Sequence, residues 1–308
     1  MVRIHRMSIV LGLLIYSPAA SAQQVADEDF RYPNPHPAYA PRQGPWVCID
    51  AAHNNYPEER YEPFADLLRG DGYRVRSFSE EFTAEALAGC GLLVTVGPMA
   101  EANRGDWAFP HLPAFSRGEL EALFNWIYGG GGLLFIADHT PFPGGGSDLG
   151  TMLGVVMADG TARLGSMRPD VFTRGDGHIS QHAILEGRGE EERVDTVVSF
   201  VGLAFRPSRE WSPLLRFGSE SYVLVNLGLN FPDLPTDQWP TFSIPGWSHA
   251  AARTVGNGRV VWLGEFTICT ALRGGEERAP LGMNHPAATQ NAQFCLNIMR
   301  WLSHILEG

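Results

Sequence analysis

The chain has 308 residues, of which 44% are hydrophobic and 19% charged, a composition typical of a folded globular protein. Its formal net charge is -11, and every basic residue is an arginine, because the sequence contains no lysine. The negative charge argues against nucleic acid as a partner, and the lack of lysine excludes Schiff-base catalysis and the lysine-bearing phosphate loop.

The first 22 residues resemble a secretory signal peptide. Arg3 and Arg6 form a basic start, Ile9–Tyr16 is an apolar stretch, and Ala20–Ala22 is a small-residue cleavage site. The apolar stretch is shorter than the roughly 20 residues that a membrane span needs. We therefore expect a periplasmic or secreted protein that begins near Gln23 and has no stable membrane insertion after removal of this leader.

The mature chain divides into an arm and one domain. Residues 23–45 are rich in Pro, Tyr and Ala without an apolar period, which indicates an extended arm or linker. Residues 46–308 alternate apolar strands with amphipathic helices, and we expect a single α/β domain with an insertion at about 155–240. The predicted strands are Trp46–Ile49, Tyr73–Phe78, Gly91–Val96, Leu133–Ala137 and Arg259–Leu263, and the predicted helices are Arg60–Arg69, Thr83–Ala88, one that follows Ser116, and Asn284–Leu306.

This order of elements predicts the fold class. Strands that alternate with helices indicate a doubly wound, mainly parallel sheet, and right-handed crossovers favour a flavodoxin-like strand order, 2-1-3-4-5. The less regular insertion is expected to be a β-containing lobe packed on the sheet. Ser116 and Glu119 form a capping box at the start of the helix that precedes the central strand.

Four cysteines, Cys48, Cys90, Cys269 and Cys295, allow three pairings in a compartment that permits disulfides. Cys48 lies inside an apolar strand and is expected to be a small buried hydrophobic residue. Cys269 and Cys295 flank the last strand and the last helix, so these two could meet.

Carboxylates end three of the predicted buried strands: Asp50, Asp138 and Glu265. Ligands bind beyond the carboxyl ends of the strands in such sheets, so these side chains stand where chemistry would be done. Carboxylates and imidazoles at one edge suit a metal site or general acid–base catalysis. Further polar residues near these strand ends are His53, Asn54, Asn55, His139, Asn284 and His285.

We assign expected roles to these residues. The candidate catalytic groups are Asp138, His139 and Glu265, and the candidate ligands of a divalent metal ion are Asp50 and His53. As an alternative, Asp50 and Asp138 only cap neighbouring loop amides and helix N-termini. The candidate substrate contacts are Asn54, Asn55, Arg60 and Asn284.

His178 and His182 form a separate pair with i, i+4 spacing. On a helix this spacing would let both side chains bind zinc. Glycines on both sides argue against a stable helix, so we favour a turn in which His182 bonds a local amide.

Several sequence blocks carry a resemblance to a known group of proteins. The blocks are Ile49-Asp50, Ala52–Asn55, Arg60-Tyr61, Pro63–Ala65, Ile136–His139, Pro141–Gly144, Gly258–Val260, Gly264-Glu265 and Gly282–Asn284. Together they resemble a family of secreted bacterial proteins, a domain of unknown function within the class I glutamine amidotransferase-like superfamily. The resemblance spans most of Trp46–Leu302 and implies a flavodoxin-like sheet with an elbow after a central strand. In the glutaminases of that superfamily the elbow holds a cysteine; here Asp138 and His139 stand there, so glutamine hydrolysis is not implied.

Two functions of different classes remain open. One is a periplasmic hydrolase with a carboxylate and histidine pocket, with or without a metal ion. The other is a non-catalytic ligand-binding or envelope scaffold domain, which the missing elbow cysteine favours. The segment His182–Gly187 is similar to a turn of trehalose-utilisation-like relatives, with Ala183 in place of proline, which implies a carbohydrate-related ligand.

Overall fold

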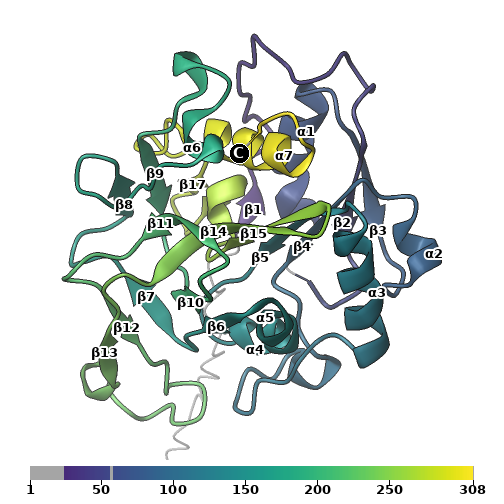
Figure 1. Ribbon diagram of the computed structural model, residues 1–308. Helices are drawn as coiled ribbons and strands as arrows, with labels where there is room; N and C mark the ends of the chain where they lie inside the picture. The colour runs from purple at the N-terminus through teal and green to yellow at the C-terminus, as the bar shows by residue number, and fades with distance from the viewer. Residues whose placement is uncertain (1–23, 56–57, 308) are drawn as a thin grey trace, which may run out of the picture.

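The computed structural model describes residues 24–55 and 58–307, so the predicted leader lies outside the described residues. A nine-stranded sheet forms the centre of the molecule (Figure 1). Counted along the chain, its parallel strands take the spatial order 2-1-3-4-5, which is the expected order. These strands are β3 (Arg74–Phe78), β2 (Trp46–Asp50), β4 (Leu92–Val96), β5 (Gly132–Ile136) and β15 (Gly258–Leu263).

The other half of the sheet is antiparallel, which corrects the expectation of a mainly parallel sheet. Gly256 and Asn257 join β14 to β15, and strands connected by so short a turn pair only antiparallel. Gly256 has φ 60°, the left-handed conformation that glycine adopts easily in such turns. The antiparallel strands are β14 (Ser248–Val255), β10 (Phe205–Pro207) and β6 (Val155–Met157), and β11 (Ser212–Arg216) pairs with β14.

The insertion at 155–240 is therefore partly continuous with the central sheet, through β6, β10 and β11. Its remaining strands form two small sheets. One consists of β13 (Thr241–Ser243), β12 (Tyr222–Leu224) and β7 (Thr161–Arg163), and the other of β8 (Asp170–Thr173) and β9 (Thr196–Ser199).

Helices lie on both faces of the sheet (Figure 1). Apolar side chains of α1 (Glu62–Gly70) and α7 (Asn291–Leu302) belong to one core cluster, and those of α3 (Arg117–Tyr128) and α5 (Ser147–Leu153) belong to another. The capping box at Ser116 and Glu119 is confirmed. The short helices are α2 (Ala84–Leu87), α4 (Phe142–Gly145) and α6 (Ala183–Glu186), with 3-10 turns η1 (Glu58–Tyr61), η2 (Glu101–Asn103), η3 (Glu190–Glu192), η4 (Thr236–Gln238) and η5 (Thr267–Cys269).

The last helix begins seven residues later than expected, because Asn284–Gln290 forms turns. Among the described residues, the structure contains no helix of the length and apolarity that a membrane crossing requires.

The N-terminal arm packs against the domain. Its strand β1 (Val25–Ala26) pairs with β16 (Ala271–Gly274), which pairs with β17 (Ala279–Gly282). Further along, the arm residue Asn34 donates a 2.8 Å hydrogen bond to the buried carboxylate of Asp71. The same carboxylate accepts two hydrogen bonds from the guanidinium of Arg300 in α7, at 2.7 and 2.9 Å. A buried ion pair therefore anchors the arm.

All four cysteines form disulfides, Cys48–Cys90 and Cys269–Cys295. The second pairing agrees with the expectation that these two residues could meet. The first corrects the view of Cys48 as an unpaired hydrophobic residue: it is fully buried, but it is cross-linked to the segment just before β4.

Candidate functional site

A cleft of about 700 Å³ opens at the carboxyl ends of β2 and β4. The loop after β2 lies on one side, the loop after β4 on another, and Phe142 of α4 completes the wall. The cleft therefore occupies the sheet edge at which the sequence predicts a site. Its polar lining residues are Asp50, Asn54, Asn55, Arg60 and Arg104, and its larger apolar ones are Met99, Trp107 and Phe142.

Asp50 is buried at the base of this cleft and its carboxylate accepts hydrogen bonds from four groups. Oδ1 accepts from the amide of Ala52 at 3.0 Å and lies 2.9 Å from Nδ1 of His53. Oδ2 accepts from Asn55 Nδ2 and Thr95 Oγ1, each at 3.1 Å. A carboxylate has about four lone-pair sites, so this one is fully engaged and is poorly placed to take a proton from a substrate.

His53 lies between two carboxylates. Its Nε2 is 2.8 Å from Oε1 of Glu119 in α3, and its ring packs on Phe82 and Phe115. Burial lowers the pKa of His53, but hydrogen bonds and charge interactions with Asp50 and Glu119 outweigh burial and raise it above its usual value.

In the charged form both ring nitrogens of His53 donate a proton, so neither has a lone pair for a metal ion. Asp50 is engaged as well, and the described part of the chain contains no group of three or more His, Cys, Asp or Glu side chains that could hold a metal ion. The residues Asp50 and His53 therefore fit the metal-binding role poorly.

A second cluster follows the neighbouring strands β5 and β15. Oδ1 of Asp138 accepts from the amide of His139 at 2.6 Å, and Oδ2 accepts from the amide of Phe266 at 3.0 Å. Oε1 of Glu265 accepts from the amide and the hydroxyl of Thr267, and Oε2 accepts from the amide of Phe200 at 3.3 Å. Asp138 thus bonds one local amide and one amide that is 128 positions away in the chain.

The two carboxyl groups of this second cluster both have raised pKa values, and burial is the main cause. Burial, followed by the charge of Asp138, raises the pKa of Glu265 to about 8. Burial also raises the pKa of Asp138 well above its ordinary value, against the opposing effect of its two backbone hydrogen bonds. Glu265 is therefore mostly protonated at neutral pH.

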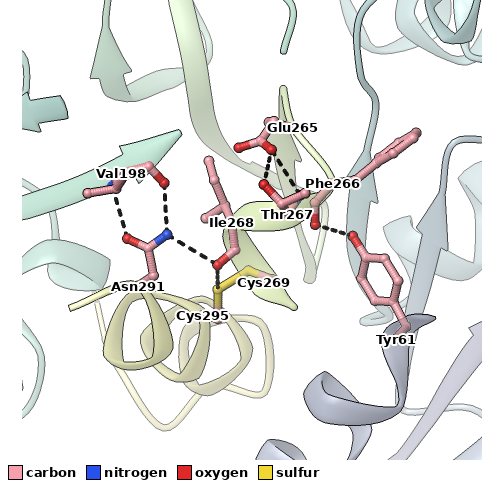
Figure 2. Close-up of a disulfide and its surroundings, with 9 residues drawn as sticks. All are labelled: Tyr61, Val198, Glu265, Phe266, Thr267, Ile268, Cys269, Asn291 and Cys295. Atoms are coloured by element: carbon pink, nitrogen blue, oxygen red, sulfur yellow. Dashed lines mark hydrogen bonds between the residues drawn. A yellow bond between two sulfur atoms is a disulfide. The ribbon is translucent and has the colours of Figure 1, made fainter. Parts of the chain in front are cut away.

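The segment that carries Glu265 is held from several sides (Figure 2). The hydroxyl of Tyr61 donates a 2.6 Å hydrogen bond to the carbonyl of Phe266. Asn291 of α7 bonds the amide and the carbonyl of Val198 and also donates to the carbonyl of Ile268. The disulfide Cys269–Cys295 then ties the segment to α7, so the position of Glu265 depends on contacts with three distant parts of the chain.

His139 adds a neutral imidazole to the second cluster. Its Nδ1 lies 2.7 Å from the carbonyl of Thr140, so Nδ1 carries the proton and Nε2 is an acceptor. Burial and the charge of Arg163 lower the pKa of His139, with the carbonyl of Thr140 acting in the opposite direction.

The two clusters stand at the same sheet edge but do not share the cleft. β4 separates β2 from β5, which places Asp50 about 10 Å from Asp138. Of the three strand-end carboxylates, the one that lines the cleft is Asp50. The rings of Phe142, which lines the cleft, and Phe266, which follows Glu265, pack at 4.7 Å.

Three of the four predicted substrate contacts lie in the cleft, and the fourth does not. Asn54, Asn55 and Arg60 line the cleft. Asn284 lies elsewhere: its Nδ2 donates to Asp27 of the arm at 2.7 Å and to the carbonyl of Leu272 at 2.9 Å. His182 accepts from the amide of Ile184, which confirms the expected bond to a local amide, but it does so as the N-cap of the short helix α6 rather than in a turn.

Sequence reasoning missed Glu119, Thr95 and Arg104. The capping box identifies Glu119 as a helix-start residue, but nothing in the sequence links it to His53, which is 66 positions away. Thr95 sits inside an apolar strand, and Arg104 sits in a loop without a recognisable motif. Only the closeness of β2, β4 and α3 in space brings these groups together.

Neither a protein-family model nor a curated protein matches this sequence. Among solved structures, the chain is similar to the mmIFT52 N-terminal domain, with a TM-score of 0.56 and 16% identity over 83% of this chain and 97% of that one. It is also similar to a ThuA-like protein from Bacteroides uniformis, with a TM-score of 0.47 and 14% identity over 88% of this chain and 95% of that one. A ThuA-like protein from Parabacteroides merdae has a TM-score of 0.43 and 8% identity over 84% and 89%. At these identities the likeness concerns the fold alone, and the structural neighbours include ThuA-like proteins, which have a class I glutamine amidotransferase-like fold.

Proposed function

We propose that this chain binds a small polar ligand with a ring face, of carbohydrate type, in the cleft beside Asp50. The observation that carries the proposal is the cleft itself, whose volume of about 700 Å³ lies at the carboxyl edge of parallel strands. Ligand pockets are commonly about 300–1,000 Å³ and combine apolar walls with a few fixed polar groups.

The walls of the cleft suit such a ligand. The side chain of Trp107 is 42% exposed and its ring lies 5.8 Å from that of Phe142, so an aromatic face is available for stacking on a sugar ring. Arg104 is an exposed cation that has only a loose ion pair, 3.8 Å from Glu101. Aromatic stacking together with hydrogen bonding would recognise a hydroxyl-rich ring.

The two asparagines of the cleft are held in place before any ligand arrives. Asn55 donates to Asp50 and to the carbonyl of Val96, and its Oδ1 accepts from the amide of His53 at 2.9 Å. Asn54 donates to the carbonyl of Met99 and has φ 47°, a backbone conformation that asparagine tolerates better than most residues. Groups held in advance lose little conformational entropy on binding, which favours affinity.

Calorimetric titration with a panel of neutral and acidic mono- and oligosaccharides tests this proposal. We expect at least one sugar to bind, and we expect Trp107→Ala to weaken its binding at least ten-fold, about 1.4 kcal/mol. Tyr128→Ala is the matched control, since it removes a 58% exposed aromatic side chain at the end of α3, outside the cleft. Binding that survives Trp107→Ala unchanged would place the ligand elsewhere.

Hydrolysis at the second cluster is the other candidate function. It is supported by a protonated Glu265 beside a neutral His139 whose Nε2 can accept a proton, which is the combination that general acid–base catalysis requires. Asp138 and Glu265 are 4% and 1% exposed, so substrate would approach from the side of His139. Any hydrolytic activity found in a substrate screen should be lost in both Glu265→Gln and His139→Ala; activity that both variants keep would exclude this cluster.

We also propose that the protein is exported to the periplasm or secreted. The signal-peptide-like leader supports export, and so do the two disulfides, because disulfides persist mainly in oxidising compartments. Cell fractionation followed by N-terminal sequencing checks this proposal. We expect a processed form that begins near Gln23, whereas an unprocessed chain in the cytoplasm would contradict export.

For the fold, we propose a flavodoxin-like core of the amidotransferase-like type, extended by an antiparallel half. The strand order of the parallel half supports this assignment, as does the likeness to the mmIFT52 N-terminal domain at a TM-score of 0.56. Asp138 and His139 stand at its elbow in place of the cysteine of the glutaminases, which argues against glutamine hydrolysis.

A further inference from the structure

The disulfide Cys48–Cys90 lies under a guanidinium group. Nε of Arg76 is 3.3 Å from Sγ of Cys48, and Nη2 is 3.6 Å from Sγ of Cys90. A positive charge beside a sulfur stabilises the thiolate and so lowers the pKa of the thiol that forms when the bond breaks. A thiol of lower pKa is also the better leaving group in thiol–disulfide exchange.

The backbone around this disulfide leaves space for the guanidinium. A Cβ atom at Gly89 would lie 2.7 Å from Nη2 of Arg76, closer than non-bonded atoms approach. Any other residue at this position would therefore push the guanidinium away from the sulfurs. Gly89 immediately precedes Cys90, so this space lies directly over the disulfide.

The two cysteines differ in burial. Cys90 is 6% exposed and is one of the residues that line a cavity of about 510 Å³, together with small residues such as Gly91 and Gly130. Cys48 is fully buried within β2. Cys90 is therefore the cysteine nearer to a thiolate that enters the cavity.

The second disulfide is more deeply buried than the first. Cys269 and Cys295 are both fully buried, and they lie in the network of hydrogen bonds that Figure 2 shows around Ile268 and Asn291. A thiolate reaches this disulfide only after local unfolding of that network.

We propose that Cys48–Cys90 is a thiol–disulfide exchange site that a dithiol reduces in the folded protein, while Cys269–Cys295 stays oxidised. A thiolate of the dithiol attacks Sγ of Cys90, the sulfur–sulfur bond breaks, and Cys48 leaves as a thiolate beside Nε of Arg76. The second thiol of the same reductant then attacks the mixed disulfide and releases Cys90. The dithiol is oxidised to a disulfide and passes two electrons to the protein, so no other co-reactant is needed.

This site is independent of the ligand cleft. It lies beside α2 and the segment that precedes β4, toward the amino ends of the parallel strands, and its chemistry uses none of the cleft residues. Reduction of this disulfide is therefore a property separate from the proposed ligand binding, and the two are tested independently.

The test measures how fast each disulfide is reduced. The folded protein is treated with dithiothreitol at pH 7, free thiols are trapped with iodoacetamide at intervals, and the labelled cysteines are quantified by mass spectrometry. We expect Cys48–Cys90 to be reduced at least about ten-fold faster than Cys269–Cys295, and Arg76→Gln to slow it by about ten-fold.

Two further variants separate the effect of the Arg76 guanidinium from a general effect of substitution. Gly89→Ala displaces the guanidinium without removing it, and should slow the reduction in the same direction as Arg76→Gln. Arg74→Gln is the matched control, because Arg74, like Arg76, is an arginine of β3 that lies over the ring of Trp46, but its Nε donates to the carbonyl of Gly44 instead of a sulfur. Equal reduction rates for the two disulfides, or a rate of Cys48–Cys90 reduction that neither Arg76→Gln nor Gly89→Ala lowers, would overturn the proposal.

Discussion

The two carboxylate clusters lie at the same edge of the sheet, and both bury carboxyl groups. They differ in how the free-energy cost of that burial is reduced. In the first, Asp50 and Glu119 flank His53, and their hydrogen bonds and charges raise the pKa of the imidazole above its usual value. In the second, burial and the charge of Asp138 raise the pKa of Glu265 to about 8. The pKa of a base is raised in the first cluster and the pKa of an acid in the second.

The difference shows that ionisation depends on the neighbours of a residue more than on its type. Buried carboxylates need either a counter-charge or a proton, because an isolated buried charge costs several kcal/mol. The first cluster uses a histidine supplied by the loop after β2. The second has a histidine next in sequence, but His139 is neutral because burial and Arg163 lower its pKa.

Removal of His53 should have the largest effect. His53→Ala would leave Asp50 and Glu119 buried without the imidazole that hydrogen-bonds both, and we expect the free energy of unfolding at pH 7 to fall by about 3–5 kcal/mol. Urea denaturation measures this change. His139→Ala is the matched control and should cost about 1 kcal/mol, because it removes a neutral hydrogen-bond donor. Similar losses in the two variants would break the distinction between the clusters.

Removal of the protonated carboxyl should change the pH dependence of stability. The pKa of Glu265 is about 8 in the folded protein and 4.5 in its ordinary state. Its contribution to stability is therefore fully present below pH 4.5 and is lost as the pH rises through 8. The free energy of unfolding of the wild type minus that of Glu265→Gln should fall by about 2 kcal/mol or more between pH 5 and pH 8.

The difference between the two proteins is the informative quantity in this experiment. Burial lowers the pKa values of His182 and His249 to about 4, so these histidines change stability with pH in the opposite direction. They are present in both proteins and cancel in the difference. A difference that stays constant from pH 5 to pH 8 would mean that Glu265 is ionised throughout.

Removal of one threonine hydroxyl from each cluster should have the smallest effect on the free energy of unfolding. Thr95 donates to Asp50, which lies beside His53, and Thr267 donates to Glu265, whose pKa is about 8. Hydrogen bonds to charged groups are the stronger ones, so we expect Thr95→Val to cost about 2 kcal/mol and Thr267→Val about 1 kcal/mol. Urea denaturation of both variants at pH 7 measures the two losses. A larger loss for Thr267→Val than for Thr95→Val would contradict the stronger hydrogen bond expected at Asp50.

Much of the parallel half of the fold was predictable. Strands such as Leu92–Val96 are short apolar runs bounded by glycine, and this pattern is characteristic of strands buried on both faces. The capping box at Ser116 marks a helix start for a local reason, because the two hydrogen bonds join residues three apart. The hairpin of β14 and β15 was missed although Gly256 and Asn257 form its turn, because the run before it, Ser248–Arg253, contains polar residues and no strong apolar period.

The sequence by itself determined which residues end the buried strands, and therefore that Asp50, Asp138 and Glu265 lie at one edge of the sheet. Local signals suffice for this, since strand boundaries depend on residues that are neighbours in the chain. Only the tertiary structure decided which carboxyl group has a pKa of about 8, which carboxylate lines the cleft, and which cysteine meets Cys48. Those outcomes depend on distances between segments 40 to more than 120 positions apart, and charge, burial and disulfide geometry act through space rather than along the chain.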